Sequence, residues 1–354
     1  MTEGRGDMAM NARARTTAGR RIALAAAATA LTVAAAALTP ASAAPGAPAA
    51  SLDYVALGDS YSAGVFVRPW DGGDGCGRSE VNYPRQAARR LKVRLTDVTC
   101  SAAEVRAGLL EPQTELKGPP SVPPPGGWGP RPAQVRAVSA DTDLVTVGIG
   151  GNSVGFADIV RTCVERGLGA FGLGSPCSAH YSRGAAATAL EERFTTLRTD
   201  FTALLAEIRT RAPKARVAVV GYPAVVDDGA GCGWGSWHQL GTVAKGDMPW
   251  LDSVERRLNG LLREQAGRSG AAYVDTYASS TGHGVCASGE QRWMYGIKDS
   301  LTGEGAQSDP PGELCRSIPA PGEACTVLHP NLRGTTHQAE LVTRALTELG
   351  ASRI

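Results

Sequence analysis

Short runs of apolar residues alternate along the chain with longer stretches in which apolar residues recur at helical spacing. Such short runs are typical of parallel strands that are buried on both faces. They lie at Tyr54–Leu57, Leu144–Val147, Val217–Val220 and Ala272–Val274, with a weaker run that ends at Val98. The helical patterns are clearest at Ala185–Thr210, Leu251–Ala266 and Thr336–Leu349. This order predicts an α/β fold, a three-layer α/β/α sandwich with a central parallel sheet.

Two stretches interrupt this alternation. Gly118–Pro132 is dense in proline and glycine, and Asp227–Pro249 is rich in glycine and tryptophan. We expect both to be surface loops without regular elements. They either shape access to a site or are tolerated insertions. Trp234, Trp237 and Trp250 near the second loop either line an acyl or sugar pocket or clamp the loop.

The N-terminal region has the pattern of a targeting signal. A basic stretch that ends at Arg20-Arg21 precedes an alanine-rich apolar run, Ile22–Leu38, and the small residues Ala41-Ser42-Ala43-Ala44. The run is short and weakly apolar for a membrane span. We therefore expect residues 1–44 to be a signal peptide and residues 45–354 to form a single secreted, extracellular domain. The arginine pair leaves both general secretory and twin-arginine export open.

Composition narrows the class of protein. Hydrophobic residues make up 43% of the chain and charged residues 20%, and the net charge is +2. These values are typical of a globular protein. No cluster of Lys and Arg alternates with aromatic residues, so we expect no nucleic-acid partner.

The chain has eight cysteines, all after the predicted cleavage site. An even number of cysteines in an exported protein indicates disulfides. Zinc would need close cysteine pairs with histidine nearby, and the chain has no such pair, so we expect no metal site. Pairing of sequence neighbours predicts four disulfides: Cys76–Cys100, Cys163–Cys177, Cys232–Cys286 and Cys315–Cys325.

The first candidate for chemistry is Ser60, in the segment Gly58-Asp59-Ser60-Tyr61-Ser62. This segment follows the first expected strand, and functional groups in open α/β sheets lie beyond the carboxyl ends of strands. A serine at the start of a helix also lies near backbone N–H groups and the positive end of the helix dipole. Ser60 is therefore either a nucleophile or a helix cap.

The second candidate segment, residues 148–156, follows another expected strand. Its glycines permit a tight turn, and the Asn152 amide can donate to an oxyanion. Ser153 lies in a literal Gly-x-Ser-x-Gly match, the nucleophile elbow of α/β-hydrolases, and is a rival nucleophile. Only two expected strands precede it, whereas several normally precede that elbow.

Among five histidines, His329 lies in a loop between Cys325 and the last expected helix. From that loop a general base could reach across to the first strand.

Together these segments resemble the GDSL/SGNH hydrolase family. The chain has Gly58–Ser62, Cys100–Ala103, Gly150-Gly151-Asn152 and His329–Gly334 in the order of that family. Asn82-Tyr83-Pro84 and Gly155-Phe156 resemble its actinobacterial secreted branch. The resemblance implies a flavodoxin-like SGNH hydrolase fold that needs no cofactor.

The resemblance also implies roles for individual residues. Ser60 would be the nucleophile and His329 the general base, and the oxyanion donors would be the N–H of Ser60, the N–H of Ala102 and the Asn152 side chain. Ala102 stands where the family usually has glycine. Thr326 stands where many relatives have an aspartate, so we expect a Ser-His dyad whose histidine is oriented by the Thr326 main-chain carbonyl.

The sequence therefore predicts a monomeric, secreted esterase or lipase that acts on a small-molecule ester or lipid. Activity should fall as the pH drops through the His329 pKa, which is about 6.5 if unperturbed. A phospholipase, a carbohydrate esterase or an acyltransferase would use the same residues. The alternative of another class is a secreted binding protein that keeps the fold without catalysis.

Overall fold

Five parallel strands form the central sheet of the computed structural model, in the spatial order β5-β1-β6-β7-β8. They are β1 (Asp53–Gly58), β5 (Arg94–Asp97), β6 (Leu144–Gly148), β7 (Arg216–Val220) and β8 (Ala272–Val274). Counting only these five, the order is 2-1-3-4-5, which is the flavodoxin-like order of a doubly wound sheet. The predicted fold class is therefore confirmed.

The structure describes residues 51–71, 73–119, 122–229, 232–233, 237–304, 315 and 322–351. The expected signal peptide, residues 1–44, lies outside the described residues. The part of the chain from Ala49 to Ile354 forms one unit. None of the described helices is long and apolar enough to cross a membrane.

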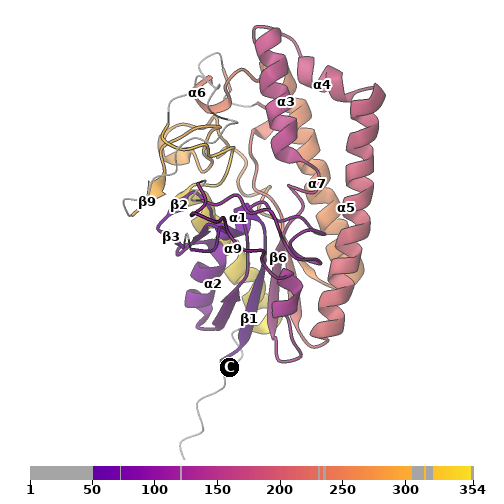
Figure 1. The fold of residues 1–354 in the computed structure, drawn as a ribbon, viewed down its shortest axis with the longest axis vertical. Helices are drawn as coiled ribbons and strands as arrows, with labels where there is room; N and C mark the ends of the chain where they lie inside the picture. Colours follow the sequence, from indigo (N-terminus) through magenta and orange to yellow (C-terminus); the bar gives the residue numbers. More distant parts are fainter. Residues whose placement is uncertain are drawn as a thin grey trace, which may run out of the picture. The chain divides into compact units, whose positions relative to one another are not determined.

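Helices cover both faces of the sheet because successive strand residues point to opposite sides. Tyr54 and Ala56 of β1 pack into one core with α2 (Tyr83–Leu91) and α9 (Leu332–Leu346). Val55 and Leu57 belong to the larger core on the other face, with α5 (Gly184–Arg211) and α7 (Met248–Ser269). Figure 1 shows the two helix pairs on opposite sides of the sheet.

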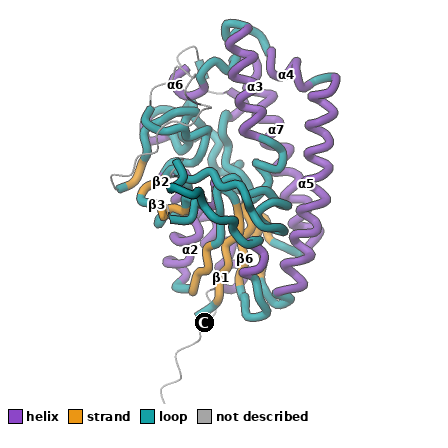
Figure 2. Tube along the Cα trace, in the orientation of Figure 1, coloured by secondary structure: helices purple, strands orange, loops and turns teal. Residues whose placement is uncertain are grey.

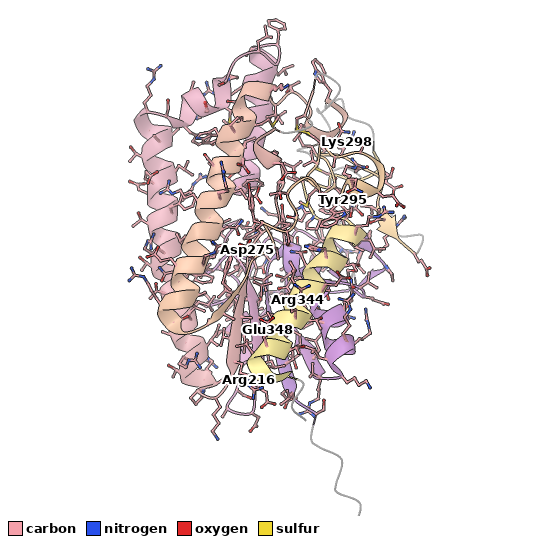
Figure 3. All side chains as sticks on the ribbon, turned by 180° about the vertical axis from the view of Figure 1, so that it is seen from behind. Arg216, Asp275, Tyr295, Lys298, Arg344 and Glu348 are labelled. Carbon is pink, nitrogen blue, oxygen red and sulfur yellow. A yellow bond between two sulfur atoms is a disulfide. The ribbon has the colours of Figure 1, made fainter. Side chains whose placement is uncertain are left out.

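Loops and short elements gather at the carboxyl ends of the strands (Figure 2). These elements are α1 (Ser60–Ala63), β2 (Val67–Arg68), β3 (Trp70–Asp71), β4 (Arg78–Ser79), α3 (Phe156–Gly169), α4 (Pro176–Tyr181), α6 (Trp237–Leu240) and β9 (Thr302–Gly303). Figure 3 shows Arg216, the first residue of β7, at one end of the sheet and Tyr295 beyond the other. The segment around Tyr295 thus lies at the end where α/β proteins place their sites.

Two expectations about the elements change in the structure. The last helix begins at Leu332, four residues before the predicted start, because the Asn331 side chain caps it by accepting the N–H groups of Arg333 and Gly334. The expectation that residues 227–249 hold no regular element is wrong. They include the single helical turn α6, and α7 begins at Met248, since proline in a first turn forgoes no helical hydrogen bond.

Four disulfides join cysteines that are neighbours in the sequence: Cys76–Cys100, Cys163–Cys177, Cys232–Cys286 and Cys315–Cys325. These are the pairs that the sequence predicts. The Cys76–Cys100 bond closes a loop of the chain beside the site described below, and the Cys163–Cys177 bond ties α3 to α4.

Helix α3 packs so closely on the loop after α6 that Gly167 is required. A Cβ at Gly167 would lie 1.8 Å from the Thr242 carbonyl oxygen, whereas a Cβ at Gly260, an exposed glycine inside α7, would meet no atom within 4 Å. We therefore expect Gly167→Ala to destabilise the protein by about 1–3 kcal/mol through overpacking. Gly260→Ala should stabilise it by about 0.5–1 kcal/mol, because alanine favours the helix interior.

Chemical denaturation of the two purified variants measures both changes. A Gly167→Ala variant as stable as the wild type would contradict the packing of α3 described here.

Candidate active site

Ser60 lies where β1 ends and α1 begins. The N-cap of α1 is Asp59, whose Oδ1 accepts the Tyr61 N–H at 3.0 Å. The capping role that the sequence left open for Ser60 is thus taken by its neighbour, and the Ser60 hydroxyl is available for other contacts. Ser60 is 8% exposed, so it is shielded yet reachable from the surface.

Two glycines let the ends of β1 and β6 meet beneath this serine. Gly58 pairs with Gly148 in the sheet. A Cβ on Gly58 would lie 2.3 Å from the Ser62 Oγ and 2.6 Å from the Gly148 oxygen. The Ser62 hydroxyl donates to that same oxygen at 3.1 Å. Gly58 and Ser62 of the motif therefore fix the turn that presents Ser60.

His329 reaches Ser60 from the other end of the chain. Its Nε2 lies 2.7 Å from the Ser60 Oγ, across 269 residues of sequence. The rings of Tyr61 and Phe66 pack against the imidazole, with centroids 4.7 Å and 5.2 Å from its own. The structure therefore brings together Ser60 and His329, the two residues that the sequence analysis proposes as nucleophile and general base.

Main-chain carbonyls hold the other nitrogen of His329. The Nδ1 lies 2.8 Å from the Thr326 oxygen and 3.1 Å from the Val327 oxygen. No carboxylate among the described residues bonds this ring. An N–H at Nδ1 can donate to these carbonyls, which leaves Nε2 as the acceptor for the Ser60 proton.

The turn that supplies these carbonyls is strained. Val327 and Leu328 have φ angles of 39° and 61°, in the left-handed region that non-glycine residues avoid. Such conformations cost about 1–3 kcal/mol each and persist only where the surroundings impose them. Here the Leu328 N–H donates to the Gly296 oxygen at 2.9 Å, and the Tyr61 hydroxyl donates to the Leu328 oxygen at 2.7 Å.

Burial lowers the pKa of His329 from 6.5 to about 4, against the opposing effect of its bonds to the Thr326 and Val327 carbonyls. An imidazolium without a nearby carboxylate is costly in a desolvated site. The unperturbed value of 6.5 used for the sequence prediction therefore does not apply. His329 is neutral, as a general base must be, over nearly the whole physiological range.

Three groups that the sequence predicts as oxyanion donors have an N–H available for a ligand. The N–H groups of Ser60 and Ala102 donate to no acceptor among the described residues. Ala102 has a φ of 60°, a conformation that favours glycine, which accounts for the family's usual residue there. Asn152 Nδ2 donates to the Ala103 oxygen at 2.8 Å, and its second N–H remains for a ligand.

One pocket joins two of these groups, Ser60 and Asn152, to His329. Ser60, Asn152 and His329 all line it, whereas Ala102 does not. Ala102 is connected to it through the next residue, Ala103, whose oxygen holds the Asn152 amide.

The rival nucleophile Ser153 faces elsewhere. Its Oγ accepts the Val105 N–H at 3.1 Å, and it does not line the pocket. No histidine among the described residues bonds it. The Gly-x-Ser-x-Gly match is therefore part of the turn before α3 and has no base of its own in the described part of the chain.

Of the three tryptophans in or beside the loop at residues 227–249, the two that the structure describes do not reach the pocket. Trp250 stacks on Tyr181 with ring centroids 5.0 Å apart, so it clamps α7 to α4. Trp237 is 47% exposed on α6, and Trp234 lies outside the described residues. Neither of the two described tryptophans lines the pocket.

Comparison with known proteins decides the family. The profile of the GDSL-like lipase/acylhydrolase family matches residues 56–336, which is most of the chain. The chain belongs to this family. As a member of the GDSL family, the protein is an ester hydrolase, and the sequence prediction of its class is confirmed.

Several relatives of the chain come from Streptomyces. The chain is 38% identical to lipase 2 of Streptomyces coelicolor over 71% of its own length and 78% of the relative's. It is 30% identical to an esterase of Streptomyces scabiei over 86% and 88%. Among solved structures, phospholipase A1 from Streptomyces albidoflavus matches with a TM-score of 0.56 and 24% identity, over 84% of this chain and 100% of that one, which shows the shared fold.

One part of this GDSL site was not foreseen from the sequence. The Tyr222 hydroxyl donates to the Asp59 Oδ2 and accepts the Gly151 N–H at 2.8 Å. Burial raises the pKa of Asp59 to about 7, although the hydrogen bond from Tyr222 opposes this rise. Tyr222 thus ties the residue before the nucleophile to the residue before Asn152. The only sequence signal that could have pointed to Tyr222 is its position just after β7, at the carboxyl end of a strand.

The pH dependence of this GDSL enzyme should follow His329. If His329 acts as the general base in its neutral form, kcat/KM should stay level as the pH falls through 6.5 and drop only near pH 4. A profile of kcat/KM between pH 3 and 8 on a soluble ester, with circular dichroism at each pH, measures this. Asp59, whose pKa is raised to about 7, also lines this pocket, so an acid limb centred near 6.5 that persists in Asp59→Asn would contradict the lowered pKa of the buried His329 ring.

Removal of the Tyr222 hydroxyl should make the positions of Ser60 and Asn152 less fixed, because this hydroxyl bonds the residue that precedes each of them. Tyr222→Phe leaves the Gly151 N–H and the Asp59 carboxyl without this partner, so kcat should fall about tenfold to a hundredfold with little change in KM. Tyr181→Phe is the matched control, because its hydroxyl bonds the Thr162 Oγ1 at 3.4 Å and Tyr181 does not line the pocket. Steady-state kinetics compare the two; a Tyr222→Phe enzyme with wild-type kcat would refute this positioning role.

Proposed function

We propose that the protein is a secreted serine hydrolase that cleaves carboxylic esters through an acyl-enzyme on Ser60, with His329 as general base. The observation that carries this proposal is the 2.7 Å contact between the Ser60 Oγ and the His329 Nε2. The two carbonyls at Nδ1 support it, because they select the tautomer in which Nε2 can take a proton.

The first step forms the acyl-enzyme. The Ser60 Oγ attacks the ester carbonyl carbon while its proton passes to the His329 Nε2. The oxyanion receives hydrogen bonds from the N–H of Ser60, the N–H of Ala102 and the Asn152 amide. The bond to the alcohol then breaks, and the departing oxygen takes the proton from His329.

The second step releases the acid. Water gives a proton to the His329 Nε2 and attacks the acyl carbon, and the same donors hold the second oxyanion. The bond to Ser60 breaks, and its Oγ recovers the proton from His329. The imidazolium that forms in each step is stabilised by the Thr326 carbonyl, which orients the ring without a negative charge.

Several observations support secretion of a single-domain enzyme. Residues 1–44 have the pattern of a signal peptide, and the four disulfides suit an oxidising compartment. A solved relative with the same fold is described as an extracellular lipase of Streptomyces rimosus. We propose that the mature protein, residues 45–354, acts outside the cell as a monomer on small esters or lipids.

Two serine variants separate this proposal from the elbow alternative. On a short-chain aryl ester, Ser60→Ala should lose at least about 10³-fold in kcat/KM, because no other group forms the acyl-enzyme. Ser153→Ala should keep activity close to wild type, since it removes only the acceptor of the Val105 N–H. The opposite pattern would assign the nucleophile to Ser153, and an inactive wild type across acyl esters, phospholipids and acetylated sugars would favour a binding protein.

A further inference from the structure

Two acidic residues line the pocket at Ser60: Asp59, whose carboxyl bonds Tyr222 and the Tyr61 N–H, and Glu255 among apolar side chains. The pocket measures about 490 Å³ out to its open mouth, and Ser60 and His329 line it. Val225 and Leu258 contribute apolar surface to the pocket, and Glu255, one helical turn before Leu258 on α7, lines it too. A carboxyl group is out of place in a wall built only for a hydrocarbon chain.

Only one of the two carboxyl oxygens of Glu255 has a hydrogen-bond partner among the described residues. It is 3% exposed, and its Oε2 accepts the Val225 N–H at 3.1 Å. Its Oε1 is buried and has no hydrogen-bond partner among the described residues. Buried polar atoms in folded proteins are nearly always paired with protein groups or ordered water, so an unpaired one in a pocket wall is a place where a ligand group can pair with it.

The surroundings of Glu255 decide which ligand groups fit. Burial raises the pKa of Glu255 well above its usual value, and Asp252 and Asp227 raise it further, while Arg256 opposes them. Because the Oε2 already accepts the Val225 N–H, the Oε1 is the oxygen left for a ligand: it accepts when the carboxyl is ionised and can donate when it is protonated. The nearby aspartates disfavour an anionic ligand, and a cation would lose its hydration between apolar walls. A neutral hydroxyl group fits, because it can both accept and donate.

We infer that Glu255 is a specificity residue that selects esters with a hydroxyl group a few bonds from the reacting carbonyl. This inference rests on the proposed function, since it places that carbonyl at Ser60. A substrate hydroxyl satisfies the Glu255 Oε1, whereas a methylene in its place leaves the atom buried and unpaired. Sites with such a buried polar group discriminate strongly against analogues that lack the matching group.

The hydroxyl can belong to the acyl part or to the alcohol part of the ester, and two substrate pairs distinguish them. Aryl 3-hydroxybutyrate against aryl butyrate tests the acyl part, and glyceryl monobutyrate against propyl butyrate tests the alcohol part. Each kcat/KM is divided by the rate of hydroxide-catalysed hydrolysis of the same ester, which removes the intrinsic effect of the hydroxyl. The wild type should prefer the hydroxylated member of one pair by at least about tenfold.

Three variants of the α7 acids test the role of Glu255. Glu255→Leu should abolish the preference, so that the ratio of the corrected kcat/KM values for the hydroxylated and the plain ester falls to about one. Glu255→Gln should retain the preference, because an amide can accept the Val225 N–H and still donate to a hydroxyl. Glu264→Leu, on an exposed face of the same helix, is the matched control and should behave as the wild type.

Each outcome supports or overturns the inference. A wild type without preference in either pair overturns it, and this result needs no variant to fold. A Glu255→Leu enzyme that keeps the preference also overturns it. In both cases Ser60-dependent hydrolysis of the plain ester still stands, whereas hydrolysis that survives Ser60→Ala would refute the proposed function instead.

Discussion

The hydrogen bond between Ser60 and His329 is the contact on which the rest of the structure depends. It joins residues 269 positions apart at a separation of 2.7 Å, so nearly the whole chain must fold correctly to form it. Strand β1 carries Ser60 to the carboxyl edge of the sheet, and the turn before α9 returns His329 to the same edge. Because α9 packs on α2 over the face of β1, one hydrophobic layer fixes both ends of the contact.

Around this contact, the protein uses backbone groups where many serine hydrolases use a carboxylate. The Thr326 and Val327 carbonyls hold the imidazole, and their turn adopts left-handed angles at Val327 and Leu328. A buried carboxylate would raise the pKa of His329, whereas here burial lowers it and the bonds to the two carbonyls offset only part of that effect. The site therefore keeps the His329 ring neutral. Once the ring is protonated, however, no carboxylate in the described part of the chain bonds it to stabilise the positive charge. Backbone strain at this turn is consistent with a functional role.

The sequence predicted the sheet, the long helices and the residues Ser60, Asn152 and His329, because these features have local patterns. Apolar runs mark buried strands, and the motifs follow strand ends directly. Tyr222 and Glu255 were missed because their roles arise only in three dimensions: Tyr222 bonds Asp59 across 163 residues, and Glu255 is one acid among several on a helix. The lowered pKa of His329 was likewise unpredictable, since it follows from burial and not from any neighbour in the sequence.

Covalent labelling tests the central claim most directly, because an organophosphonate reacts only with a serine activated by a base and supported by oxyanion donors. The account predicts a single adduct, located by peptide mass mapping on Ser60, which is lost in His329→Ala. An adduct on Ser153, or labelling of Ser60 that persists without His329, would contradict it.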